Sequence, residues 1–166
     1  MKVLDLFAGC GGMSLGFRQQ GFQVCGVDIN EFTPAIFEQN DIGEALLVDL
    51  MRELVDMPCD VLTGGPPCRP WSPYNQQKGK RRDRHPDFPL LRRYFEHVSR
   101  IRPAVFILEN VVAATRDVLQ AAAALREEYA IEHRIVDYSQ WGAATRRRRL
   151  FVTGVRRELG KDPHML

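Results

Sequence analysis

Several features that often identify a class of protein are missing from this sequence. No apolar run approaches the length of a membrane span, and a strand pattern begins directly after Met1, so we expect neither an anchor nor an export signal. The four cysteines lie far apart without any C-x-x-C pair, which argues against a zinc site or a disulfide framework. We therefore expect a protein without metal or membrane contact in a reducing compartment, the cytoplasm or the nucleoid.

The size and the charge distribution narrow the class further. The 166 residues fit a single domain, and a composition of 45% hydrophobic and 27% charged residues excludes both a disordered chain and a coiled coil. A net charge of +2 does not by itself indicate a nucleic-acid partner. However, bases cluster at Lys78–Arg84 and at Arg146–Arg149, and these clusters either contact phosphates or form solvated loops.

Strand patterns alternate with helical patterns along the whole chain. Short apolar runs predict strands at residues 2–7, 22–27, 44–48, 59–63, 103–108, 131–138 and 150–155. Helical spacing occurs in residues 13–20, about 30–40, 90–98 and from 115 onward, where Val118, Ala121, Ala122, Leu125 and Tyr129 share a stripe. This alternation predicts an α/β fold with a doubly wound, mainly parallel sheet.

A glycine-rich turn, Ala8–Gly12, follows the first strand, and Asp28 ends the second. This arrangement is typical of Rossmann-like nucleotide sites, in which the acid accepts hydrogen bonds from ribose hydroxyls. Ser14 stands where the third glycine of a dinucleotide fingerprint would be, which favours a ligand without a pyrophosphate, such as S-adenosylmethionine. Asp28 is alternatively a helix-capping or strand-end carboxylate, and Asp49 either contacts an adenine or caps a helix beginning at Leu50.

The segment Gly64–Ser72, GGPPCRPWS, follows a predicted buried strand and contains Cys68. Carboxyl ends of strands hold the chemistry of open α/β sheets, and the two prolines fix the backbone beside the cysteine. The neighbouring Arg69 would favour the nucleophilic thiolate. The alternative is a proline-rich surface turn with an incidental cysteine.

Two further features follow this segment. Residues 72–89 form a long basic loop, which we expect to be a mobile lid over nucleic acid or a disordered segment. Glu109 follows a continuous apolar strand, where a carboxylate is costly without a role or a partner. It is either a general acid near the thiol or a structural acid paired with an arginine.

In their order along the chain, these motifs resemble the DNA (cytosine-5)-methyltransferase family, from residue 3 to about residue 155. The resemblance rests on Asp5–Gly12, Asp28, Asp49, Pro66–Cys68, Leu90, Glu109–Val111, Arg147 and Arg149. Each motif is weak alone, but the ordered set is specific.

The resemblance implies a Rossmann-like fold and methyl transfer from S-adenosylmethionine to C5 of a flipped-out cytosine, leaving S-adenosylhomocysteine. Double-stranded DNA is the implied substrate, as in restriction–modification, and a branch of the family methylates tRNA. The implied catalytic residues are Cys68, Glu109, Arg147 and Arg149. The implied cofactor residues are Leu6, Phe7, Ala8, Gly9, Gly11, Gly12, Asp28, Ile29, Asp49, Leu50, Pro67 and Leu90.

The sequence departs from the family pattern in three respects. Arg69 replaces the usual glutamine after the nucleophile, and Ala144 and Thr145 replace proline and glutamine before the arginines. The target-recognition domain and the C-terminal motifs have no counterpart, so we expect a split enzyme needing a complementary subunit, a truncated chain or a degenerate relative. A non-catalytic nucleic-acid or cofactor-binding protein remains a second hypothesis, and a nicotinamide dehydrogenase is disfavoured by the missing glycine.

Overall fold

A computed structural model describes residues 1–72 and 82–163 of the chain. Its strands are β1 (Lys2–Leu6), β2 (Gln23–Asp28), β3 (Glu44–Leu47), β4 (Val61–Gly64), β5 (Val105–Val111), β6 (Tyr129–Asp137) and β7 (Arg148–Arg156). Its α-helices are α1 (Gly12–Gln19), α2 (Thr33–Gln39), α3 (Phe88–Ile101) and α4 (Thr115–Ala122). The alternation expected from the sequence is confirmed.

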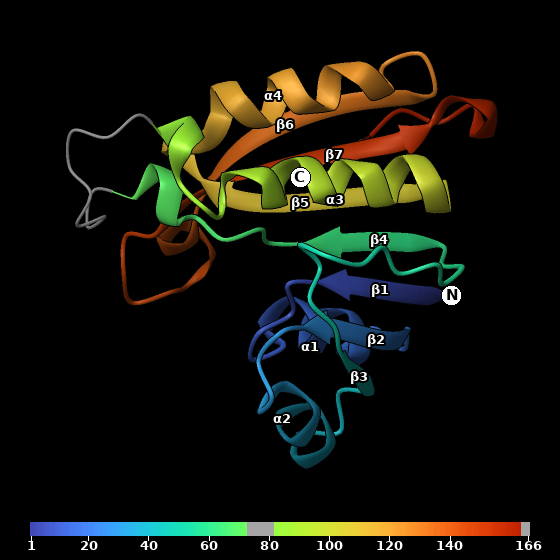
Figure 1. Cartoon of the computed structure of the whole chain (residues 1–166), viewed down its shortest axis with the longest axis vertical. Helices are drawn as coiled ribbons and strands as arrows, with labels where there is room; N and C mark the ends of the chain where they lie inside the picture. Colours follow the sequence, from blue (N-terminus) through green and yellow to red (C-terminus); the bar gives the residue numbers. More distant parts are fainter. Residues whose placement is uncertain (73–81, 164–166) are drawn as a thin grey trace.

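The strands form a single sheet in the order β3-β2-β1-β4-β5-β7-β6 (Figure 1). All neighbours pair in parallel except β7, which runs antiparallel to both β5 and β6. The chain moves outward from β1 to β3 and then returns to β4 on the other side of β1. This reversal creates a switch point at the carboxyl ends of β1 and β4, where open α/β sheets bind their ligands. The prediction of a doubly wound, mainly parallel sheet is therefore confirmed.

Helices cover both faces of the sheet because alternate strand residues point to opposite sides. Leu4, Leu62 and Phe106 pack beneath α3 and α4, which lie over β5, β6 and β7 in Figure 1. Val3 and Val61 point the other way and pack with Phe37 of α2. The two apolar clusters fix the sheet between its helices and hold its strand ends in place.

One part of the second face is less covered. The register places Val105 opposite Val155, Ile107 opposite Thr153, and Glu109 opposite Phe151. Directly opposed residues share a face, so these side chains lie on the face that α1 and α2 share. Ile107 and Phe151 stay partly exposed there.

Three boundaries differ from the sequence prediction. No helix begins at Leu50, where residues 50–52 form only a turn. The strand expected to end at Leu108 continues to Val111, because β7 pairs with it over its whole length. Tyr129 does not belong to the helical stripe: α4 ends at Ala122, and Tyr129 opens β6, where its hydroxyl donates to the carbonyl of Pro103 at 2.8 Å.

The predicted loop of residues 72–89 is only partly described. Residues 73–81, including Lys78 and Lys80 of the first basic cluster, lie outside the described residues. Beyond them, Arg82–Arg84 form a 3-10 turn and α3 begins at Phe88, so the last two loop positions are helical. Trp71 and Arg82, on either side of the gap, both contact the carboxylate of Asp117, at 2.7 and 3.3 Å.

Candidate functional site

The loop between β1 and α1 packs tightly against Phe37 of α2 and against Ile42. Phe7, Gly9 and Gly11 all have positive φ angles, of 60°, 53° and 75°. A Cβ added at Gly11 would lie 2.8 Å from side-chain carbons of Phe37 and Ile42. Only glycine combines this backbone conformation with this close packing, so the loop can present its backbone to a ligand.

Asp28, at the end of β2, supports the same loop. One carboxylate oxygen accepts the amide of Gly9 at 2.8 Å, and the other accepts the amide of Asn30 at 2.8 Å. The strand-end role considered from the sequence is therefore present. Each oxygen keeps a second lone pair for a further donor.

A first cavity of about 380 Å³ lies at the carboxyl ends of β1, β2 and β4. It brings together seven residues of the predicted cofactor set: Phe7, Asp28, Ile29, Asp49, Leu50, Pro67 and Leu90. Val48, Met51, Gly65, Arg69, Pro86 and Asp87 complete its wall. The cavity therefore combines three carboxylates, of Asp28, Asp49 and Asp87, and the guanidinium of Arg69 with apolar side chains.

Asp49 reaches this wall from a turn rather than from a helix end. Its carboxylate accepts the amide of Met51 at 2.9 Å and lies 3.3 Å from the guanidinium of Arg52. Of the two alternatives for Asp49, the helix cap is wrong, because residues 50–52 form a turn and not a helix.

A second cavity of about 510 Å³ adjoins the first. Phe7 and Gly65 line both. The remaining lining residues of the second cavity are Asp5, Ala8, Gly12, Met13, Glu109, Tyr138, Arg147 and Phe151. Two predicted catalytic residues and two more of the predicted cofactor residues thus meet around it.

Glu109 is the central acid of the second cavity. Its carboxylate lies 2.9 Å from Nε of Arg149, and the side chain is 20% exposed. Burial raises the pKa of Glu109 above its ordinary value, while the guanidinium groups of Arg149 and Arg147 oppose that rise. The pairing with an arginine considered from the sequence is present, and it leaves the other carboxylate oxygen to face the cavity beside Gly65.

The arginine run contributes unequally to this region. Arg147 lines the second cavity, with its guanidinium 5.9 Å from the centroid of the Tyr138 ring, whereas Arg149 orients Glu109 from outside. Arg146 and Arg148 are exposed. The family's R-x-R positions therefore fall on the two arginines next to the acid.

Cys68 lies four residues beyond the end of β4 and is exposed. Its carbonyl accepts the amide of Trp71 at 3.0 Å, and the carbonyl of Pro66 accepts the side-chain amide of Asn110 at 3.0 Å. The second bond ties the segment before Cys68 to β5, the strand that carries Glu109. Cys68 itself lines neither cavity.

The charge of Arg69 is directed differently from the sequence expectation. Its Nε lies 2.7 Å from a carboxylate oxygen of Asp87, at the wall of the first cavity. The guanidinium is therefore paired with an acid that was not among the predicted site residues.

Other predicted residues lie behind the cavities. Leu6 is fully buried in the core, while Gly9 and Gly11 shape the loop without lining either cavity. In the second cavity, Met13, Tyr138 and Phe151 lie outside the motifs identified in the sequence, and Asp5 was identified only as part of the motif Asp5–Gly12. The position of Asp5 in the strand before the glycine loop could have identified it as a site residue. No sequence feature marks the other three.

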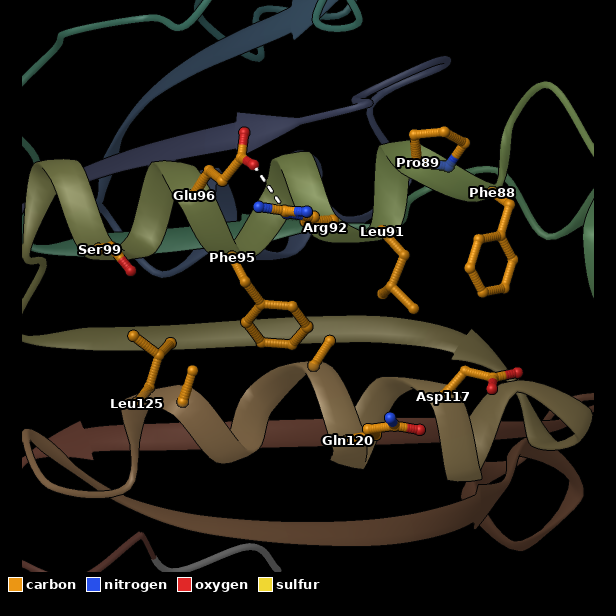
Figure 2. A pocket seen from close by; sticks show the side chains of 12 residues that line it. Phe88, Pro89, Leu91, Arg92, Phe95, Glu96, Ser99, Asp117, Gln120 and Leu125 are labelled. Atoms are coloured by element: carbon orange, nitrogen blue, oxygen red, sulfur yellow. Dashed lines mark ion pairs between the residues drawn. The ribbon is translucent and has the colours of Figure 1, made fainter. Parts of the chain in front are cut away.

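A third hollow lies away from this site. The groove between α3 and α4 has a volume of about 620 Å³ and is lined by residues such as Leu91, Phe95 and Leu125 (Figure 2). None of the predicted site residues lines it.

Among residues 1–72 and 82–163, no group of three His, Cys, Asp or Glu side chains is placed to hold a metal ion. Helices in the described part of the chain are too short or too polar to cross a membrane.

Comparison with known proteins identifies relatives over almost the whole chain. The family model for C-5 cytosine-specific DNA methylase matches residues 1–165. Type II methyltransferase M.AplI of Arthrospira platensis is 35% identical over 92% of this chain and 45% of its own length. M.HgiDI of Herpetosiphon aurantiacus is 36% identical over 94% of this chain and 52% of its own length. The chain thus spans about half the length of these relatives.

Solved structures agree with the fold. A DNA modification methyltransferase encoded within an E. coli prophage superposes with a TM-score of 0.78 at 28% identity, over 99% of this chain and 49% of that one. The S. pombe Dnmt2 methyltransferase shares the fold with a TM-score of 0.70 at 20% identity, over 93% of this chain and 50% of that one. The motifs, the fold and the match over residues 1–165 lead to one conclusion: this chain belongs to the C-5 cytosine-specific DNA methylase family.

Proposed function

We propose that this chain carries the cofactor pocket and the catalytic residues of an enzyme that methylates C5 of cytosine in double-stranded DNA. The observation that carries the proposal is the junction of the two cavities at Phe7 and Gly65. One cavity has the residues expected for a nucleoside, and the other has the acid and the arginine expected for a cytosine. A methyl group at the junction would face the base.

The first cavity suits S-adenosylmethionine, which would supply the methyl group on a positively charged sulfur. Asp28 and Asp49 offer lone pairs to ribose hydroxyls and to the adenine amine, while Leu50 and Leu90 offer apolar surface to the ring. The amino-acid end would reach the second cavity along the backbone at Ala8–Gly12. The absence of a third glycine agrees with a ligand that has no pyrophosphate.

Cytosine C5 is too weak a nucleophile to take the methyl group unaided. We propose that the thiolate of Cys68 adds to C6 of the base, forming a carbon–sulfur bond and moving the C5–C6 electron pair onto C5. C5 then takes the methyl group. A base removes the C5 proton, the C5–C6 double bond re-forms and the thiolate of Cys68 leaves.

Glu109 would hold the base during this addition. A protonated Glu109 can donate to N3, where negative charge develops, while its second oxygen accepts the exocyclic amine. The raised pKa of Glu109 moves its titration towards the protonated form, and the donor Nε of Arg149, 2.9 Å from one carboxyl oxygen, holds the group in place. Arg147 would contact the base or its phosphate from the cavity wall.

The target atoms are inaccessible inside a duplex, so the cytosine must flip out to reach Glu109. Arg146 and Arg148, which flank Arg147 at the start of β7, are exposed, and their guanidinium groups would meet the phosphate backbone. A Cβ added at Gly65 would lie 3.4 Å from the Glu109 carboxylate, so the backbone at the junction of the two cavities lies beside the acid proposed to hold the base.

A methyl-transfer assay tests the proposal. The chain is incubated with labelled S-adenosylmethionine and duplex DNA, with and without the C-terminal half of M.AplI. We expect Cys68→Ser and Glu109→Ala to abolish transfer. Transfer that persists in Cys68→Ser would refute the covalent mechanism.

Cys25→Ser provides the matched control. Cys25 lies in β2 beside Leu4, at the amino end of the sheet and away from both cavities. This variant should transfer methyl groups at the wild-type rate. Loss of activity in both cysteine variants would indicate a general sensitivity to thiol replacement rather than a nucleophile at Cys68.

RNA is the second candidate substrate, and tRNA transcripts should be assayed in parallel with DNA. The family description favours DNA. Transfer to tRNA alone would overturn the choice of DNA while leaving the proposed chemistry intact.

The chain covers about half of its relatives, and we propose that a complementary segment packs on the less covered sheet face. Ile107 and Phe151 are partly exposed there, and Phe151 also lines the second cavity. A segment that covers this face would both bury apolar surface and close the second cavity. Ile107→Lys should therefore prevent co-purification with the C-terminal half of M.AplI, whereas Leu47→Lys, on the distant edge strand β3, should not. Equal co-purification of both variants would contradict this docking face.

A further inference from the structure

The segment after β3 forms one wall of the first cavity but has little regular structure. Asp49 and Leu50 line the cavity, and residues 50–52 form a turn followed by irregular chain up to residue 59. Irregular segments keep a defined shape only where side chains or other backbone groups satisfy their hydrogen bonds. The contacts that hold this segment therefore decide where Asp49 and Leu50 lie.

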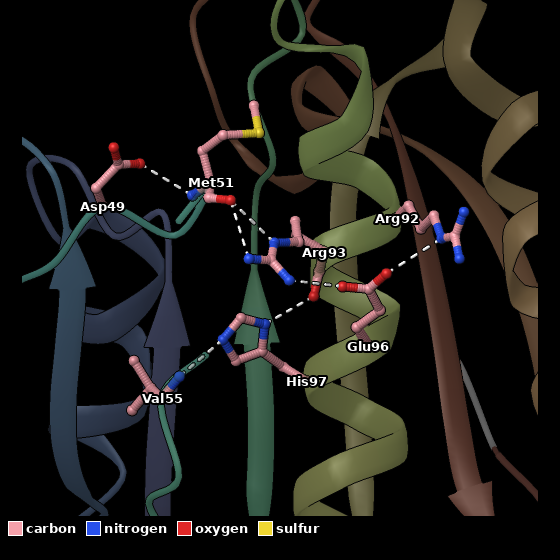
Figure 3. A network of polar contacts seen from close by, with 7 residues as sticks. All are labelled: Asp49, Met51, Val55, Arg92, Arg93, Glu96 and His97. Carbon is pink, nitrogen blue, oxygen red and sulfur yellow. Dashed lines mark hydrogen bonds and ion pairs between the residues drawn. The ribbon is translucent and has the colours of Figure 1, made fainter. Parts of the chain in front are cut away.

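Arg93 of α3 supplies the first of these contacts (Figure 3). Its Nε and one terminal nitrogen both donate to the carbonyl of Met51, at 3.2 and 2.9 Å. The other terminal nitrogen donates to Glu96 at 2.9 Å, which keeps the guanidinium in the plane required for the double contact. Arg93 thus holds the residue next to Leu50.

His97, one turn further along α3, supplies the second contact. Its Nε2 accepts the amide of Val55 at 3.1 Å, and its Nδ1 lies 2.7 Å from the carbonyl of Arg93. A carbonyl can only accept, so the proton must reside on Nδ1, and Nε2 must be bare to accept an amide. Both ring nitrogens are satisfied by one neutral tautomer.

The surroundings of His97 favour that neutral form. The side chain is fully buried, and burial lowers the pKa of the imidazole below its ordinary value. Protonation would place an N–H group against the amide N–H of Val55. The contact with the segment therefore depends on a histidine without charge.

The same helix also forms the opposite wall of the first cavity. Leu90, Arg93 and His97 lie three and four residues apart, so they share one side of α3. Leu90 lines the cavity directly, whereas Arg93 and His97 bind the segment that carries Asp49 and Leu50. The three residues together set the spacing between the two walls.

We infer that Arg93 and His97 are positioning residues for the cofactor pocket, and that they fix Asp49 and Leu50 by binding Met51 and Val55 from α3. The inference rests on the proposed assignment of the first cavity to S-adenosylmethionine. Neither residue touches the cavity itself, so each acts through the backbone that it holds.

Four variants of the full chain test this inference, with S-adenosylhomocysteine as the probe in calorimetric titrations. Arg93→Met and His97→Leu remove the contacts and keep most of the side-chain volume. We expect each to weaken binding by about tenfold, since each loses one or two hydrogen bonds to the segment after β3. His97→Gln can still accept the Val55 amide through its side-chain oxygen and should bind nearly as well as the wild type. Arg92→Met is the matched control, because Arg92 is exposed and contacts only Glu96 among these residues.

Hydrogen exchange of the Val55 amide provides a readout that does not need the ligand. It should accelerate in His97→Leu and stay slow in His97→Gln. Wild-type affinity in Arg93→Met and His97→Leu would overturn the inference while leaving the cofactor pocket intact. Failure of the wild-type chain to bind S-adenosylhomocysteine, with slow Val55 exchange retained, would instead overturn the assignment of the pocket and the inference with it.

Discussion

Replacing Asp5 by asparagine should stabilise this protein at neutral pH. Asp5 is 2% exposed in β1, and its carboxylate accepts the hydroxyl of Ser14 at 2.6 Å. Burial raises the pKa of Asp5 from its ordinary 3.8 to about 6, the hydrogen bonds from Ser14 oppose the rise, and the charge of Asp28 adds a little to it. A carboxylate that is ionised at neutral pH is therefore held where the charge is unfavourable.

The magnitude follows from the pKa values of Asp5 in the folded and unfolded states. At about 1.4 kcal/mol per pH unit, a rise from 3.8 to about 6 corresponds to about 3 kcal/mol. Because the folded pKa is the higher one, the contribution of Asp5 to stability is fully present below pH 3.8 and is lost as the pH rises through 6. Above that pH, Asp5 lowers the free energy of unfolding by the full amount.

Urea unfolding of the wild type and of Asp5→Asn, between pH 4 and pH 7.5, measures this contribution. Asparagine has no charge to bury and can still accept the Ser14 hydroxyl. The variant should be more stable by up to about 3 kcal/mol at pH 7.5, and the difference should shrink towards pH 4. Asp41→Asn is the control, since Asp41 is exposed and its ion pair with Arg18 should contribute less than about 1 kcal/mol. A difference between wild type and Asp5→Asn that does not vary with pH would refute the reasoning.

Three further predictions concern the site. Gly11→Ala should lower the unfolding free energy by about 2 kcal/mol or more, because the position has a positive φ and its Cβ would meet Phe37; wild-type stability in chemical denaturation would contradict this. Arg69→Gln and Asp87→Asn should each weaken S-adenosylhomocysteine binding by only a few fold, because each removes the same partly exposed ion pair. The double variant should therefore bind no more weakly than either single variant. Additive losses of affinity in titration would show that the two residues have separate roles. Methyl transfer should decline as the pH rises through the raised pKa of Glu109, because the protonated form is lost, and Glu109→Gln should remove that dependence from the pH–rate profile.

The topology was predictable because it depends on local patterns in the sequence. The strand runs, the glycine turn at Ala8–Gly12 and the apolar run before Glu109 are determined by periodicity and by special backbone residues. Their order then specifies the switch point where both cavities lie. The fold class needed no information about side-chain contacts.

The details that the sequence could not predict depend on contacts between distant segments. The strand containing Glu109 extends to Val111 because β7 pairs with it, and β7 lies about forty residues further along the chain. Asp49 caps no helix, because its carboxylate closes a turn and Arg93 holds the segment that follows. In the sequence, Arg93 and His97 look like solvent-exposed positions of a helix. Their contacts with Met51 and Val55 can be seen only in the folded structure.

The site shows the same division. Asp28 and Glu109 were identifiable because carboxylates at strand ends are unusual, whereas Tyr138 lines the second cavity only because its loop folds back beside Arg147. The charge of Arg69 was visible in the sequence, but its partner Asp87 was not. Pairing between loops is decided by three-dimensional placement rather than by spacing.

Covalent trapping tests the central claim most directly. The chain, supplied with the C-terminal half of M.AplI and S-adenosylmethionine, is mixed with duplex DNA carrying 5-fluorocytosine at candidate targets. Fluorine cannot leave as the C5 proton does, so the bond between the Cys68 sulfur and C6 should persist. Mass spectrometry should locate the nucleotide on the peptide that contains Cys68. Methylation of ordinary DNA by the same mixture with no adduct on Cys68, or with the adduct on another cysteine, would contradict the account.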